Sequence, residues 1–354
     1  MSRRKLIWHI GLADAPRPLL PANLSAHSDS LCAAGVEVVA TAEESRLATH
    51  ELLRTHQQAG LARREVEGRW ARICDRVWQH KGVSMLSTPD LCAADKDQIR
   101  LALNPLIGVE VHLVVTLDSF SQQIYGSWLA ELRSGRSTGW EKYVARVLAS
   151  RPDHAQAERF WGGHDLPALL SRWGWTFHSD RLHVVASPCV ESHWSEFLDI
   201  AGVASSGLDA VVPAYADPAG VAVLRKVNRQ LEEPIGPGTV ALLTSVDREG
   251  SAMPVAPTGE LAPLVSEWAA ALSGAGQDVR GDLAMLVEDG PETSLPGPRD
   301  QLGVAVDVLT EALTDNARLR TLVDSLEADR ERLERKRRKL KRRLKRVRAA
   351  GEAA

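Results

Sequence analysis

Residues 109–116 read VEVHLVVT, a nearly continuous apolar run that predicts a β-strand buried on both faces. Four other short apolar runs also predict strands: 5–12 (KLIWHIGL), 36–40, 83–86 and 182–186 (LHVVA). Stretches of helical character lie between them, at 43–58, 64–80, 96–103, 121–132, 166–173 and 192–200. This alternation predicts an α/β fold, with an open parallel sheet flanked by helices. Ligands of such sheets bind beyond the carboxyl ends of the strands, so the loops after Leu12, Leu86 and Thr116 are the candidate site.

The domain organisation follows from length and from breaks in composition. The 354 residues, 44% hydrophobic and 25% charged, suit one large globular domain with appendages. Stretches rich in Pro, Gly, Ser and Thr at 234–260 and 290–300 predict linkers, with a helix at 261–272 between them. We therefore expect an α/β domain over 1–233, a linker and helix-rich extension over 234–303, and a helical tail over 304–350.

Several protein classes are disfavoured by the cysteine and apolar patterns. The four cysteines are scattered, with no C-x-x-C pair and no histidine at metal-ligand spacing, so neither a disulfide framework nor a metal site is expected. The apolar run after the basic N-terminus is too short and broken for a signal peptide. No stretch approaches 18 apolar residues, so no transmembrane segment is expected, and the predicted location is cytoplasmic.

A series of motifs gives the chain a family resemblance. The first predicted strand ends in His9-Ile10-Gly11-Leu12, and the later blocks, in order, are VEVHLVVT, RFWGGHDLPALLSRWG (159–174), RLHVVASP (181–188), LRKVNRQL (224–231) and DVRGDL (278–283). Over residues 5–320 the chain resembles a bacterial family of sulfotransferase-like P-loop proteins. The resemblance implies a P-loop fold and transfer of a sulfuryl group from 3′-phosphoadenosine-5′-phosphosulfate (PAPS) to a hydroxyl or amine.

The loop after the first strand departs from the pattern of that family. There the family carries Pro-Lys-x-Gly-Thr-Thr, whose backbone N–H groups and lysine meet the phosphates. Residues 13–18 here are ADAPRP, which puts Asp14 at the lysine position and Pro16 at the glycine position. Pro16 and Pro18 have no N–H to donate, and Arg17 is the one cation of the loop. Reversing a charge about 4 Å from a phosphate changes the energy by up to about 8 kcal/mol at an effective dielectric near 20.

Two other loops depart in the same way. The arginine that the resemblance implies for the 3′-phosphate falls on Asp118, and the histidine of a Ser-His-Glu element falls on Thr88. The degenerate donor-site positions are thus Gly11, Asp14, Pro16, Arg17, Pro18, Thr88 and Asp118. We expect no catalytic residue and no cofactor, with PAPS as the cofactor if the donor site works.

Replacement catalytic groups are few. His9 lies in or at the end of a strand, which favours a packed, hydrogen-bonded histidine. Asp165, next to His164, precedes Leu166-Pro167 as a helix N-cap would. Ser187 and Ser192 flank Cys189 and His193, but no nucleophile motif surrounds them.

The tail has a seven-residue repeat typical of a coiled coil. Leucines recur at 319, 326, 333 and 340, followed by Val347, and the companion positions hold Leu309, Asn316, Val323, Arg330, Arg337 and Leu344. Two arginines in the seam of a parallel dimer would repel one another and lose hydration. We therefore expect self-association through 304–328, while 330–348 splays or stands as a single helix.

Charge is strongly segregated between the tail and the rest of the chain. Eleven of the fourteen residues at 335–348 are basic, including Arg335, Lys336, Arg337, Arg338, Lys339, Lys341, Arg342 and Arg343, whereas residues 1–334 carry a net charge of −13. Three interpretations stay open: a solvated helix, a binding site for an anionic polymer or surface, and a helix that docks on the acidic body or on an acidic partner.

These patterns support three functional hypotheses. The first is a degenerate sulfotransferase-like pseudoenzyme that acts through protein or anionic-polymer interaction. The second is an active PAPS-dependent sulfotransferase of a glycan or small-molecule hydroxyl, with a rebuilt donor site. The third is a nucleic-acid-associated protein that works through its basic tail.

Overall fold

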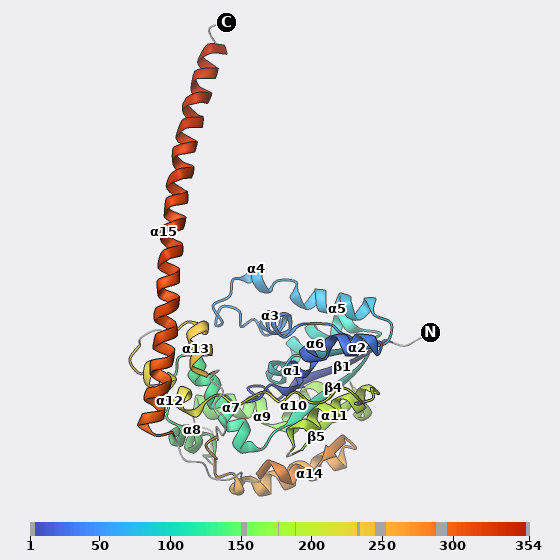
Figure 1. Ribbon diagram of the computed structural model, residues 1–354. Helices are drawn as coiled ribbons and strands as arrows, with labels where there is room; N and C mark the ends of the chain where they lie inside the picture. Colours follow the sequence, from blue (N-terminus) through green and yellow to red (C-terminus); the bar gives the residue numbers. More distant parts are fainter. Residues whose placement is uncertain are drawn as a thin grey trace.

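The computed structural model describes residues 4–149, 154–175, 177–187, 189–231, 234–244, 253–287 and 296–351, with backbone only beyond residue 341. Six parallel strands form one open sheet in the order β2-β3-β1-β4-β5-β6 (Figure 1). The strands are β1 (Lys5–Gly11), β2 (Val36–Val38), β3 (Val83–Ser87), β4 (Glu110–Leu117), β5 (Leu182–Ala186) and β6 (Asp278–Gly281). The predicted α/β class, with a parallel sheet between helices, is confirmed.

Helices flank the sheet and extend beyond it. The α-helices are α1 (Leu19–Ala26), α2 (Ser28–Ala33), α3 (Ala42–Leu53), α4 (Arg63–Val66), α5 (Arg69–Gln79), α6 (Lys96–Leu103), α7 (Phe120–Arg133), α8 (Trp140–Val147), α9 (Ala155–His164), α10 (Leu166–Gly174), α11 (Val190–Ala201), α12 (Pro218–Asn228), α13 (Pro237–Thr244), α14 (Ala262–Gly274) and α15 (Pro298–Gly351). Short 3-10 turns are η1 (Pro89–Ala93), η2 (Asn104–Leu106), η3 (Ser179–Arg181), η4 (Gly259–Leu261) and η5 (Leu283–Val287).

Both faces of the sheet are buried, as the apolar strands predict. Leu6, Trp8 and Ile10 alternate along β1 and pack under α5, α6, α10 and α14. Ile7 points to the other face, where it joins a second core with α1, α2 and α11. The sheet therefore forms the middle of three layers, and the ends of its strands meet at one edge.

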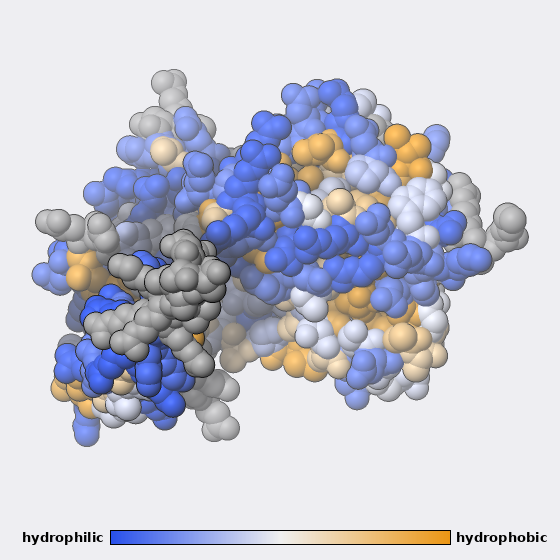
Figure 2. All heavy atoms as spheres, turned by 90° about the horizontal axis from the view of Figure 1, so that it is seen from above, coloured by the Kyte–Doolittle hydropathy of each residue, from blue (hydrophilic) through white to orange (hydrophobic). Residues whose placement is uncertain are grey.

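A separate helical cluster surrounds α7, which follows β4. It contains the buried faces of α7, α8, α12 and α13, and the first turns of α15 pack on it through Ala305 and Val308. Beyond these turns α15 projects away from the body (Figure 1). When the molecule is viewed from above, its surface is mostly hydrophilic with scattered apolar patches (Figure 2).

The extension after residue 233 contributes to the sheet. It contains the helices α13 and α14, and also β6, whose residues pair with β5 from His183 to Ala186. The predicted boundary at residue 233 thus does not coincide with the edge of the sheet. Gly281, at the end of β6, has a φ of 92°, and a Cβ there would lie 1.8 Å from the carbonyl oxygen of Ala186, so only glycine fits this close approach.

Candidate functional site

The loop after β1 is pressed between η1 and α7. A Cβ on Gly11 would lie 2.7 Å from the Cβ of Cys92, and a Cβ on Gly126 of α7 would lie 1.8 Å from the carbonyl oxygen of Asp14. Asp14 has a φ of 55°, a left-handed conformation that aspartate tolerates better than most residues. The loop therefore turns a carbonyl group, an acceptor, against α7, while Pro16 and Pro18 offer no donors.

The carboxyl group of Asp14 lies in a crowded, mixed-charge surrounding. Burial, with a smaller effect from the negative charge of Asp90, raises the pKa of Asp14 to about 7 against the opposing influence of Arg133 and Arg159. Solvent still reaches the Asp14 side chain, so screening limits what this shift contributes to stability. Arg159 is itself held by the buried carboxylate of Glu131, at 2.9 Å.

Arg17, the one cation of the loop, is directed at an aromatic ring. Its guanidinium carbon lies 4.3 Å from the ring centroid of Tyr215, a cation–π contact. Gln122 of α7 fixes the same tyrosine by donating from Nε2 to its hydroxyl at 2.7 Å. The charge of Arg17 also acts on Asp118, where it opposes the rise of that pKa.

At the end of β4, Asp118 and His193 of α11 interact. Burial raises the pKa of Asp118, while the positive charges of His193 and Arg17 oppose that shift. Burial likewise lowers the pKa of His193, although the Asp118 charge and the carbonyls of Leu117 and Ser187 favour its protonated form. His193 is 3% exposed, and its Nε2 has no hydrogen-bond partner among the described residues. An acidic group whose charge acts on a buried histidine thus occupies the position where the resemblance implies a phosphate-binding arginine.

Thr88, at the end of β3, is turned into the core. Its hydroxyl accepts a hydrogen bond from Nε1 of Trp8 at 2.7 Å, and its backbone N–H donates to the carbonyl of His9. His9 is held by two hydroxyls, with Ser87 2.8 Å from Nδ1 and Thr116 3.2 Å from Nε2. The prediction that His9 is a packed, hydrogen-bonded histidine is confirmed, and Thr88 is itself only 2% exposed.

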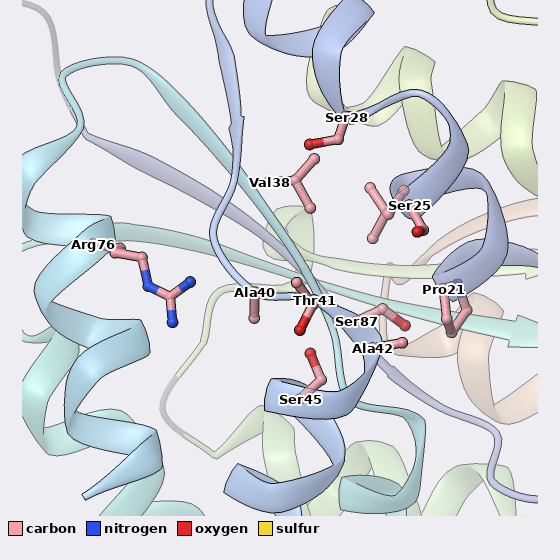
Figure 3. Close-up of a pocket in the computed structure, with 11 residues that line it drawn as sticks. Pro21, Ser25, Ser28, Val38, Ala40, Thr41, Ala42, Ser45, Arg76 and Ser87 are labelled. Carbon is pink, nitrogen blue, oxygen red and sulfur yellow. The ribbon is translucent and has the colours of Figure 1, made fainter.

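A cavity of about 230 Å³ lies beside these residues, at the carboxyl ends of β2 and β3 (Figure 3). The hydroxyls of Ser45 and Thr41, at the start of α3, point toward it, and Ser87 forms part of its wall (Figure 3). Arg76 reaches it from α5, but both of its terminal nitrogens bind the carboxylate of Glu44, at 2.7 and 3.0 Å. Because this pair balances its charge, the cavity suits a small, neutral, hydroxylated molecule better than an anion.

No family model, no curated protein and no solved structure matches this chain. Within the described part of the chain, no three His, Cys, Asp or Glu side chains are grouped to hold a metal ion. No described helix is both long and apolar enough to cross a bilayer.

The predicted donor-site positions lie at the carboxyl ends of β1, β3 and β4, but their side chains make different contacts. Gly11 ends β1, Asp14, Pro16, Arg17 and Pro18 lie in the loop after it, and the charges of Arg17 and Asp118 both act on Tyr215. Asp165 accepts a hydrogen bond from the N–H of Ala168 at 3.1 Å, so its predicted role as an N-cap is confirmed. The sequence named His193 only as a neighbour of Cys189, and it missed Tyr215. No local motif marks these residues, which come from α11 and from the segment before α12 and interact with Asp118 and Arg17.

The buried histidines predict sensitivity to acid. Burial lowers the pKa of His9 to about 3 and that of His164 to about 4, whereas an unfolded chain protonates histidine near 6.5. The stability that these neutral rings provide is therefore complete above pH 6.5 and falls by about 1.4 kcal/mol per pH unit for each ring below it. Urea denaturation from pH 7.5 to pH 4.5 should show this loss, and His9→Gln should make the dependence shallower. Equal slopes for the two proteins would contradict the assignment of His9 as a buried neutral ring.

Proposed function

We propose that this chain is a non-catalytic, sulfotransferase-like protein that acts by binding a partner through its projecting helix. The observation that carries the proposal is the loop after β1. It places the carboxylate of Asp14 at the lysine position implied by the resemblance, and it turns the carbonyl of the same residue against Gly126. A phosphosulfate group needs converging N–H donors and a cation at this place.

The remaining strand ends support the same proposal. The nearest cation of the loop, Arg17, stacks on Tyr215. Asp118 adds a second acidic group at the end of β4, where its charge acts on His193, and the hydroxyl of Thr88 is engaged by Trp8 in the core. The position of β1 between β3 and β4 also supports a sulfotransferase-like scaffold, because the loop after it lies where connections to the two halves of the sheet diverge.

Isothermal titration calorimetry with 3′,5′-adenosine bisphosphate tests the loss of the donor site. We expect no binding up to millimolar nucleotide. Micromolar binding that Arg17→Ala abolishes, and that the exposed control substitution Arg72→Ala preserves, would show a working donor site and overturn the proposal.

A second candidate, an active sulfotransferase with a rebuilt donor site, is favoured by one observation. The charges of Arg133 and Arg159 both act on Asp14, so two cations from α7 and α9 lie near the loop. In that case the hydroxyl-lined cavity beside Ser87 is where an acceptor hydroxyl would bind. This candidate predicts nucleotide binding that Arg133→Ala weakens, and transfer of labelled sulfate from PAPS to a hydroxylated acceptor.

A further inference from the structure

The outer part of α15 carries an apolar seam that nothing in the described chain covers. Every side chain from residue 313 to residue 341 is exposed. These include Leu319, Val323, Leu326, Leu333 and Leu340, each more than half exposed. They follow the seven-residue repeat, so they lie along one stripe of the helix. A stripe of this kind on a projecting helix needs a partner to shield it from water.

A parallel pairing of two such helices is unfavourable. It would set Arg330 against Arg330 of the second copy, and Arg337 against its own equivalent, in a desolvated seam. At the flanking positions it would also set Asp329 near Glu334, and Lys336 near Lys341. Each of these contacts joins like charges.

An antiparallel pairing removes these conflicts. The two antiparallel helices are centred between Asp324 and Ser325 of each copy. In this register, the numbers of two residues that face each other across the seam add up to 649. Val323 then meets Leu326, Leu319 meets Arg330, and Asn316 meets Leu333 of the second copy. Arg337 meets Ala312, whose small side chain leaves room for the arginine to bend toward solvent. No arginine faces another arginine in any layer.

The flanking charges select the same register. Arg320 lies beside Glu327 of the second copy, and Asp315 lies beside Lys336; each contact occurs twice by symmetry, and no like charges meet at these positions. The net charge of residues 300–329 is −5 and that of residues 335–348 is +11, so the antiparallel arrangement lays basic segments along acidic ones. The acidic body, from which α15 projects, adds to this attraction.

We propose that α15 pairs with α15 of a second copy of this chain as an antiparallel coiled coil centred between Asp324 and Ser325. This deepens the proposed function, on which it rests, by naming the partner. The two can fail separately, since nucleotide binding tests the donor site and oligomeric state tests the pairing.

Light scattering coupled to size-exclusion chromatography of the full chain measures the assembly. We expect twice the monomer mass of 38.6 kDa. Val323→Asp puts two carboxylates into the central layers and should weaken the dimer by about a hundredfold or more. Thr321→Asp is the matched control, because Thr321 is also exposed and β-branched but lies on the outer face of the helix, away from the seam and its flanking positions. A wild-type monomer, or equal weakening by both substitutions, would overturn the pairing.

Disulfide trapping tests the direction. In a background with the exposed Cys32 and Cys189 replaced by serine, the pair Leu319→Cys and Arg330→Cys in one chain should give a covalent dimer on mild oxidation. Leu319→Cys alone should not, because residue 319 meets its own equivalent only in a parallel pair. Efficient linkage of that single variant would overturn the antiparallel register. If the chain is instead a monomer that binds nucleic acid through residues 330–348, with an affinity that falls steeply as salt rises, the partner is a polyanion and the pairing is overturned.

Discussion

Replacing Gly126 by alanine should destabilise the protein by about 1–3 kcal/mol and displace the loop after β1. The added Cβ would lie 1.8 Å from the carbonyl oxygen of Asp14, and 3.1 Å from Cδ of Pro16. A backbone carbonyl cannot rotate aside as a flexible side chain can, so α7 and the loop must separate. The direction of this change in stability is informative, because alanine normally stabilises a helix relative to glycine by about 1 kcal/mol.

The control for this prediction is Gly162→Ala in α9, where a Cβ would meet nothing within 4 Å. That substitution should leave stability unchanged or raise it slightly. Urea denaturation of both variants measures the difference. Should Gly126→Ala be as stable as the control, the loop does not rest against α7 as described.

Replacing Trp8 by alanine should cost about 3–5 kcal/mol. The Trp8 ring is fully buried, stacks on Trp70 with centroids 5.1 Å apart, and meets Trp173 edge-on at 5.5 Å. Its Nε1 also holds Thr88, so the substitution frees the end of β3 beside the candidate site. Trp175→Ala is the control, because that ring is 53% exposed, and it should cost less than about 1 kcal/mol.

Two milder variants keep the Trp8 prediction measurable if Trp8→Ala does not fold. Trp8→Phe keeps an aromatic ring and loses the hydrogen bond. Thr88→Val removes the acceptor alone and leaves the buried indole N–H unpaired. Each substitution should lower the free energy of unfolding by about 1–3 kcal/mol. Thermal and urea denaturation measure the stability of both variants. A cost near zero for Thr88→Val would contradict the buried hydrogen bond between the two side chains.

The sheet could be predicted from the sequence because its signal is local. The run at 109–116 became β4 with a shift of one residue, and 182–186 matched β5 without any shift. Helices with clear start signals were also predictable, such as α6, where Asp95 caps the N–H of Gln98. By contrast, β6 was missed because DVRG has no apolar run. It is a strand only because β5 offers an open edge.

The residue types at the candidate site were determined by sequence alone: Asp14, Pro16 and Pro18 lack the donors and the positive charge that a phosphate requires, whatever the fold does. The seven-residue repeat and the segregated charge of the tail were likewise fixed by residue order. Only the tertiary structure decided which way these groups face. It set Arg17 on Tyr215, brought His193 to Asp118 and placed the carbonyl of Asp14 against Gly126. The physical reason is that local patterns determine strands and helices, whereas contacts between distant segments depend on packing that no single segment encodes.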